Sequence, residues 1–560
     1  MAPPATRDPH DPPGRGRPGR RERGVAALVA LAGWAAVTAA LQISGATITR
    51  RDVAINWQID SIPNLVDNPF TSSFYRHVQP PLYNLFIGVV LRWSPFPKIG
   101  TLWVLWLLAL AGCGLLLADL LVRLRVPGPA AGAIAALALA NPNLLATMPI
   151  ASYEVPIALL LLAALRVGVT LPSHPSARRW LAFSALLTAL ALTRSLFHPV
   201  WVLAVLGLVA LVRPPSRRTL LVAFALPIVL VGGWMLKNQV LFGQATTSSW
   251  LGFNMTRGVT ATMTHDQVER AVADGNVSRL ALEYPWGQLD QYRAWTGGCV
   301  PGDRHASLSD LVEPEHGGAN FNNECFLPVY RQAERDARAL IERYPGRYLV
   351  TRWEPIRWSF ATAALGFDDV ESGFAGGDVA RPTWMDRFGD RWLLPIDAVS
   401  NQRDWNLPLL AVPEVPGRIS LTLAALYVVV VGRGGLGALR LAGSLRRRLR
   451  GRRSGSGDEP EAEDGTTAEV GARLADGRDG EREGVELLWC VLGLTALMVV
   501  VGGALLEYGE NGRFRAVLDP LLVGLPLGAA WRVAADRLAA RRSGEGEDGQ
   551  LVAAGGERLG

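Results

Sequence analysis

The sequence predicts an α-helical polytopic membrane protein with about ten transmembrane helices and a mixed α/β domain on the extracytoplasmic side. The chain has 560 residues, of which 49% are hydrophobic and 19% are charged. Soluble domains typically carry about 25% charged residues. The apolar residues gather in runs that approach the ~20 residues needed to cross a bilayer. Arginines gather in the short segments between these runs, and such segments mark the cytoplasmic side of a membrane.

The N-terminal residues 1–24 are basic and rich in proline and glycine, and they predict a disordered cytoplasmic tail. No small-residue cleavage site stands out after the apolar run that follows, so this run is expected to remain as the first helix, at about 25–45. The polar loop 46–99 contains an amphipathic stretch, Pro81–Trp93. This stretch is either a short span or a helix on the outer surface. The surface position is preferred because it leaves every short basic loop on one side.

The remaining helices follow in order along the chain. Further helices at about 100–122, 129–147, 155–171, 180–196, 199–212 and 219–238 complete a transmembrane core of residues 25–238. Residues 239–416 are too long for a connecting loop and predict the extracytoplasmic domain. The C-terminal part predicts helix 8 at 417–438, a disordered cytoplasmic linker at 439–485, helices 9 and 10 at 486–535, and a disordered cytoplasmic tail at 536–560. The topology indicates a multi-pass protein of the cell membrane with a cytoplasmic N-terminus.

This topology gathers three carboxylates on the outer face. Asp52 and Asp60 lie in the loop after the first helix, and Glu154 lies between helices 3 and 4. The preferred general base is Asp52, which lies about seven residues beyond the expected end of the first helix, and Asp60 is the weaker candidate. Glu154 would orient the acceptor or assist the base. The alternative is that Asp52 and Asp60 are solvated loop acids and that Glu154 has a structural role.

Basic residues gather on the same face, where ionisable groups are usually functional. Arginine and lysine bind phosphate, arginine through a bidentate fork. The candidates for binding a donor phosphate are Arg194, Lys237, Arg513 and Arg515. The alternative is that Arg194 and Lys237 only extend to the lipid headgroups. The polar residues expected to line the same site and bind substrate are His77, His198, Asn238 and Glu510.

Metal, nucleotide and nucleic-acid sites have no sequence signature. No His, Cys or Asp spacing is typical of a zinc site, and no glycine-rich nucleotide loop follows a strand. The charges in 330–338 favour a solvated helix over a nucleic-acid patch. Cys299 and Cys325 lie in the outer domain, where a disulfide is possible, although spacing alone does not fix the pairing.

Four passages carry a resemblance to a known family. They are His77-Val-Gln-Pro-Pro-Leu-Tyr-Asn-Leu, Ala151-Ser-Tyr-Glu-Val-Pro, Trp234-Met-Leu-Lys-Asn-Gln-Val-Leu-Phe-Gly with the later Ser248-Ser-Trp-Leu-Gly-Phe-Asn, and Glu510-Asn-Gly-Arg-Phe-Arg. Together they resemble the GT-C superfamily of polytopic glycosyltransferases, which includes protein O-mannosyltransferases (glycosyltransferase family 39) and lipid A aminoarabinose transferases. The chain departs from the family's Asp-Glu pair, since it has Arg51-Asp52-Val53 there.

The resemblance implies a sugar donor attached to a polyprenyl phosphate and transfer on the outer face with inversion. The acceptor would be a glycan, a lipid or a protein of the cell envelope. An outer-loop carboxylate would take the acceptor proton while the basic residues stabilise the departing phosphate. No cofactor is certain, and a divalent metal is compatible with the resemblance without being required. The alternatives are a lipid or glycan transporter or flippase, and a non-catalytic GT-C-like protein of envelope assembly. The absence of internal repeats favours the enzyme over the transporter.

Overall fold

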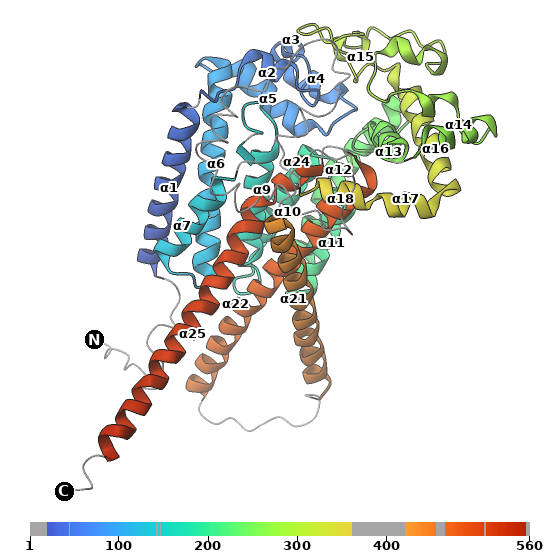
Figure 1. Cartoon of the computed structure of the whole chain (residues 1–560). Coiled ribbons are helices and arrows are strands. Elements are labelled where there is room, and N and C mark those ends of the chain that lie inside the picture. The colour runs from blue at the N-terminus through green and yellow to red at the C-terminus, as the bar shows by residue number, and fades with distance from the viewer. Residues whose placement is uncertain are drawn as a thin grey trace.

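The computed structural model describes residues 19–360 and 421–555, apart from positions 44, 142–143, 146, 262, 455–464 and 509–510. In these ranges every regular element is helical, and the β-structure is limited to an isolated bridge between Val312 and Ala319. A bundle of long helices carries a head of shorter helices at one end (Figure 1). The head consists of residues 46–97 and 243–360.

The bundle is that of a helical membrane protein. Five stretches in the described part of the chain are long and apolar enough to cross a membrane: α1 (Arg20–Ile43), α6 (Lys98–Arg123), α12 (Arg217–Phe242), Thr422–Arg448 and Asp479–Leu506. Four further predicted spans are shorter helices: α7 (Gly128–Leu139), α9 (Glu154–Gly168), α10 (Ala177–Thr193) and α11 (Pro199–Val212). They have 12 to 17 residues, fewer than the ~20 that cross a bilayer unaided. The expectation of about ten spans is therefore supported for five helices only.

The C-terminal helices close the bundle. They are α21 (Leu421–Ser454), α22 (Gly465–Leu497), the π-helical turn η5 (Met498–Gly502), α23 (Gly503–Leu506), α24 (Asn511–Ala516) and α25 (Asp519–Gly555). Helix α21 packs against α22 and α25, and α25 also packs against α6 and α7. A Cβ atom added to Gly434 of α21 would lie 3.0 Å from Cα of Gly493 on α22. Such close approach through small residues is typical of helix pairs in membranes.

Two segments expected to be disordered are helical. Residues 439–454 and 465–485 of the predicted linker belong to α21 and α22, and most of the predicted tail 536–560 belongs to α25. Arg448 of α21 binds the Glu483 carboxylate at 2.6 Å, and Arg433 binds Glu486 at 2.6 and 2.9 Å. Composition alone suggested disorder because it does not show that the charges of one helix neutralise those of its neighbour.

The head is built from two segments far apart in the chain. The first contains α2 (Arg50–Ala54), α3 (Ile62–Asp67), α4 (Pro69–Tyr75) and α5 (Pro81–Trp93). The second contains α13 (Leu251–Thr260), α14 (His265–Ala273), η1 (Arg279–Leu282), η2 (Leu289–Trp295), α15 (Ala306–Ser309), α16 (Phe326–Arg343), α17 (Pro345–Thr351) and α18 (Trp353–Trp358). Trp57 of the first segment packs against Trp286 and Phe321 of the second, with ring centroids 5.8 and 4.8 Å apart. This aromatic core joins the two segments into one unit.

The predicted amphipathic helix at 81–93 is confirmed as α5. Its 13 residues extend only about 20 Å, less than a bilayer core. Helix α5 packs against α3, α4, α6 and α10. It therefore connects the first head segment to the bundle.

The expected mixed α/β domain is not supported by residues 239–360, which contain no strand; the rest of that region, 361–416, lies outside the described residues. Asparagine side chains hold the turns before α16 in place of a β-ladder. Asn320 donates to the carbonyl of Asp310 at 2.8 Å, and Asn323 donates to the same carbonyl at 3.0 Å. Side chains that bond to nearby backbone compete with regular secondary structure.

Candidate functional site

A buried charged cluster lies where three bundle helices end. Glu154 is the first residue of α9, Arg194 caps the C-terminus of α10, and Arg513 lies in α24. The Glu154 carboxylate lies 2.8 Å from Nε of Arg513 and 3.4 Å from Nη1 of Arg194. The side chains of Glu154, Arg194 and Arg513 are 0%, 3% and 8% exposed. The sequence analysis expected these three residues on one face of the bundle together with several others, and in the structure these three are in contact.

The turn before α9 fixes the position of Glu154. Ala151 has a φ of 49°, which is unusual for a residue other than glycine. The backbone is held there because Tyr83 donates to the carbonyl of Ala151 and Trp106 donates to that of Ser152 at 2.9 Å. Backbone strain of this kind persists only where the surroundings over-determine it, and it is common at functional sites.

Within the described residues, two guanidinium groups face one carboxylate in this cluster. The guanidinium of Arg194 also lies 4.6 Å from the centre of the Tyr153 ring and 4.3 Å from that of Phe514. Nη2 of Arg194 and Oε2 of Glu154 are buried and have no hydrogen-bond partner within the described residues. Buried polar atoms without partners are costly, and a ligand oxygen could satisfy the Arg194 N–H.

A second polar network surrounds Asp60 in the head. The buried carboxylate of Asp60 accepts hydrogen bonds from the Ser72 hydroxyl at 2.7 Å and from the Ser61 N–H at 2.8 Å. Nη1 of Arg76 lies 3.7 Å from the same carboxylate, and both side chains are almost fully buried. A carboxylate has about four acceptor positions, so room remains for a further donor.

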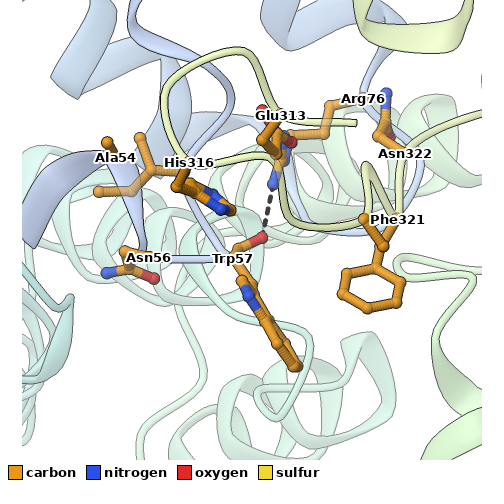
Figure 2. Close-up of a pocket in the computed structure, with 10 residues that line it drawn as sticks. Ala54, Asn56, Trp57, Arg76, Glu313, His316, Phe321 and Asn322 are labelled. Carbon is orange, nitrogen blue, oxygen red and sulfur yellow. Dashed lines mark hydrogen bonds between the residues drawn. The ribbon is translucent and has the colours of Figure 1, made fainter. Parts of the chain in front are cut away.

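A narrow cleft lies beside this network, between the first head segment and the turn at 313–322 (Figure 2). The space is shallow: it amounts to about 240 Å³ only when the solvent at its mouth is included, and it encloses no room for a water molecule. Nη2 of Arg76 donates to the carbonyl of Trp57 at 2.8 Å across the cleft, and His316 and Glu313 point toward the same space (Figure 2). The lining residues are Ala54, Asn56, Trp57, Ile59, Arg76, Glu313, His316, Ala319, Phe321 and Asn322.

The protonation of Glu313 is strongly perturbed. Burial of its carboxyl and the nearby charge of Asp60 raise the pKa of Glu313 to about 8, while Arg76 opposes the shift. Burial also lowers the pKa of His316 below its usual value. At neutral pH the cleft therefore holds a protonated carboxyl and a neutral imidazole beside the Arg76 guanidinium. Perturbed groups that gather in a cleft indicate a functional site.

The cleft and the charged cluster are connected through the backbone. Asn56, which lines the cleft, donates to the carbonyl of Ile150 at 3.0 Å. Ile150 lies just before the turn that places Glu154. The two parts of the site thus share the segment 150–154, and a change in one is expected to move the other.

No family model, curated protein or solved structure matches the chain. The function is therefore argued from the geometry of the site.

Several residues expected in the site have structural contacts instead. Asp52 forms a capping box with Thr49, whose N–H and hydroxyl donate to the Asp52 carboxylate at 2.8 and 2.6 Å. His198 is exposed and caps α11 by accepting from the Val200 N–H at 3.3 Å. His77 is buried between the Ser249 hydroxyl at 2.6 Å and the Asn322 carbonyl at 2.9 Å. Its burial lowers the pKa of His77 to about 3, so the ring is neutral.

The remaining basic candidates are also engaged. Lys237 donates to the carbonyls of Phe74 at 2.9 Å and Arg76 at 3.3 Å, and its ammonium lies 3.5 Å from the Trp234 ring centre. Arg515 is fully buried and bound to Asp519 through two contacts of 2.8 and 3.1 Å. Both arrangements favour structural roles over phosphate binding.

Three further expectations concern Asn238, Glu510 and the cysteines. The Asn238 amide donates to the Thr246 carbonyl at 2.7 Å, at the junction of α12 and the head. Glu510 lies outside the described residues. The disulfide between Cys299 and Cys325 is present, with Cα atoms 5.5 Å apart. Among the described residues, no three His, Cys, Asp or Glu side chains are placed to hold a metal ion.

Sequence reasoning missed Arg76 and the turn that carries Glu313 and His316. Arg76 directly precedes the His77 motif, so its position next to a quoted passage was a usable signal. The run Glu313-Pro-Glu-His316 was the second signal, since three ionisable residues adjoin one proline there. Neither signal showed that the two segments meet.

Proposed function

We propose that this chain is a membrane glycosyltransferase that moves a sugar from a polyprenyl-phosphate donor to an acceptor hydroxyl, with inversion. The observation that carries the proposal is the buried cluster in which two guanidiniums face one carboxylate. Nη2 of Arg194, which has no hydrogen-bond partner among the described residues, lies in this cluster. Such a site favours a phosphate because arginine presents several N–H donors to its oxygens.

The proposed reaction is a single displacement. The acceptor oxygen attacks the anomeric carbon of the sugar, and the bond from that carbon to the phosphate oxygen breaks. Arg194 and Arg513 stabilise the negative charge that develops on the departing lipid phosphate. The acceptor proton goes to a carboxylate of the first loop. Asp60 is favoured over Asp52 because it lies beside the cleft, whereas Asp52 holds the capping box.

The proposed location is the cell membrane, with the head on the extracytoplasmic side. The Cys299–Cys325 disulfide belongs to the head, and disulfides persist in oxidising compartments. Arg446, Arg447 and Arg448 lie in the part of α21 away from the head, as expected of a cytoplasmic end (Figure 1).

The test measures binding of polyprenyl phosphate to the full chain in lipid nanodiscs. Arg194→Ala and Arg513→Ala are each expected to weaken binding about tenfold or more, because each removes a charge-assisted contact of roughly 1.5–3 kcal/mol. The matched control is Arg335→Ala, an exposed arginine on α16. Lys237→Ala is expected to lower stability without a comparable loss of binding. Unchanged binding by both cluster variants would refute the phosphate site.

Transfer itself is tested with a polyprenyl-phosphate sugar and a mixture of hydroxylated acceptors. Loss of transfer in both cluster variants, with normal transfer by the control, supports the enzyme. Binding of the lipid phosphate without transfer to any acceptor would favour a lipid carrier.

A further inference from the structure

Three arginines meet at the end of the bundle away from the head, where α1, α6 and α9 pack together (Figure 1). They are Arg23 of α1, Arg123 of α6 and Arg166 of α9. All three converge on the carboxylate of Asp119, which belongs to α6. Nε of Arg123 lies 2.9 Å from this carboxylate and Nε of Arg23 lies 3.7 Å from it, while Arg166 donates to it directly. We call these four residues the far-end cluster.

The far-end cluster holds more positive charge than its acids neutralise. In the described ranges three guanidinium groups share the single carboxylate of Asp119, and the charges of the other two arginines repel that of Arg166. The neighbouring acid on α1, Glu22, accepts a hydrogen bond from the Gly128 N–H and can neutralise one further charge at most. Charges of one sign that are held together repel one another and attract a counter-ion.

The far-end cluster is open to a ligand at the edge of the apolar bundle. The side chains of Arg23, Arg123 and Arg166 are 40%, 22% and 27% exposed. Helices α1 and α6 are both long and apolar enough to cross a membrane, and both end at this cluster. Leu28, five residues after Arg23 on α1, is 69% exposed. An anion that carries apolar chains therefore fits this boundary better than a free ion does.

We propose that the far-end cluster binds the phosphate of an anionic phospholipid, whose acyl chains lie along the apolar surface of α1. Basic pockets between membrane helices bind acidic headgroups in this way, and arginine presents a fork of N–H donors to phosphate oxygens. The cluster is separate from the Arg194–Arg513 site, because Arg166 lies about 18 Å along α9 from Glu154. The proposal does not depend on sugar transfer.

The experiment follows loss of the folded, monodisperse full chain on heating in a neutral detergent. Phosphatidylglycerol, phosphatidylcholine or inorganic phosphate is added in increasing amounts. A ligand that binds only the folded chain raises its stability with concentration, which gives an apparent affinity. Phosphatidylglycerol should stabilise the chain, and the other two should do so at least fivefold more weakly.

Variants of the arginines locate the binding site. Arg123→Gln and Arg166→Gln should each weaken the apparent affinity for phosphatidylglycerol about fivefold, the effect of one basic residue beside an acidic headgroup. The matched control is Arg179→Gln, since Arg179 is an exposed arginine at the same end of the bundle that donates to the His174 carbonyl at 2.6 Å. The control should bind phosphatidylglycerol like the unmodified protein.

Asp119→Asn separates lipid binding from a purely structural role. It removes the carboxylate that the three arginines share, so the lipid-free chain should be less stable while phosphatidylglycerol binds more tightly. If the cluster only ties the helices together, every variant loses stability and phosphatidylglycerol stabilises none of them, which would overturn the proposal.

Three other results would also overturn it. Equal stabilisation by inorganic phosphate would make a free anion the ligand, and equal stabilisation by phosphatidylcholine would show that the net charge of the lipid has no part. A phosphatidylglycerol effect that is lost in Arg194→Ala and kept in Arg166→Gln would place the lipid at the head end. Binding of polyprenyl phosphate is measured separately, so the proposed function and this lipid site can fail independently.

Discussion

Arg515 provides the sharpest test of how the basic residues divide their roles. It lies two residues after Arg513, and both were candidates for the donor phosphate. In the structure Arg515 binds Asp519 through two contacts of 2.8 and 3.1 Å, and both side chains are 0% exposed. Removing one partner of such a pair leaves a buried charge without compensation, which typically costs about 3–5 kcal/mol. We therefore expect Arg515→Met to be strongly destabilised.

Arg513→Ala is expected to behave differently. Its partner Glu154 keeps a second guanidinium, that of Arg194 at 3.4 Å, so the carboxylate is not left unpaired. The loss of stability should be smaller than for Arg515→Met, and the loss of lipid-phosphate binding should be larger. The double variant Arg515→Met with Asp519→Leu removes both charges and should recover most of the stability, because apolar replacement of a buried pair is often neutral.

The assay follows loss of the folded, monodisperse protein on heating in detergent. The same preparations are then used for lipid-phosphate binding at a temperature where each variant is folded. The reasoning fails if Arg515→Met is as stable as the unmodified protein. It fails equally if folded Arg515→Met has lost lipid-phosphate binding while Arg513→Ala has kept it.

Three further predictions can be checked independently. A topology reporter at Ser216 should read cytoplasmic and one within Asp310–Gly317 should read external; the reverse pattern would place the head on the wrong side for the proposed reaction. Asp60→Asn should lower turnover about 10²- to 10⁴-fold, the usual contribution of a general base. Asp52→Asn should cost about 1 kcal/mol of helix-cap stability and little activity. Near-normal transfer by Asp60→Asn together with loss of transfer in Asp52→Asn would make Asp52 the base. His77 has a folded pKa of about 3, below its unfolded value near 6.5, so between these pH values only the unfolded chain gains a proton. The protein should therefore lose stability as pH falls below about 6.5. The difference in heat denaturation between pH 7 and pH 5 should be smaller in His77→Gln than in the unmodified protein.

The long helices could be read from the sequence because apolar length is a local property. Runs such as 100–122 appear almost unchanged in α6, since the bilayer demands about 20 apolar residues with internal hydrogen bonds. The linker at 439–485 was misjudged for the opposite reason. Its helices are paired through Arg448 and Glu483, residues 35 positions apart, and composition carries no information about that pairing.

The charged cluster was partly predictable. Glu154, Arg194 and Arg513 all end helices on one side of the predicted bundle, so topology alone brings them together. Spacing also shows that Arg513 and Arg515 lie on different faces of one helix, because residues two apart do not share a face. It does not show which of them faces Glu154. That depends on how α24 is rotated against α9, which is a matter of tertiary packing.

The cleft could not be predicted because it is made by contacts between distant segments. The Ile62 N–H donates to Glu315 at 3.0 Å across 253 positions, and the His77 N–H donates to Asn322 at 2.9 Å across 245. The capping role of Asp52 could have been predicted from the sequence. Thr49 and Asp52 stand three residues apart ahead of a short helix, which resembles the spacing of a capping box.

The two parts of the site differ in sign, and this difference constrains the donor under the proposed function. The Arg194–Arg513 cluster favours an anion, whereas the acidic surroundings of Arg76 disfavour one. A lipid phosphate at the cluster and a neutral hydroxylated acceptor near Asp60 and Arg76 match the two parts, with Asn56 and Ile150 connecting them. A nucleotide sugar would add a charged nucleoside diphosphate, for which the described residues offer no second basic cluster beside Arg194 and Arg513. The charge distribution therefore favours a lipid-phosphate sugar, whose remaining mass is apolar and stays in the bilayer.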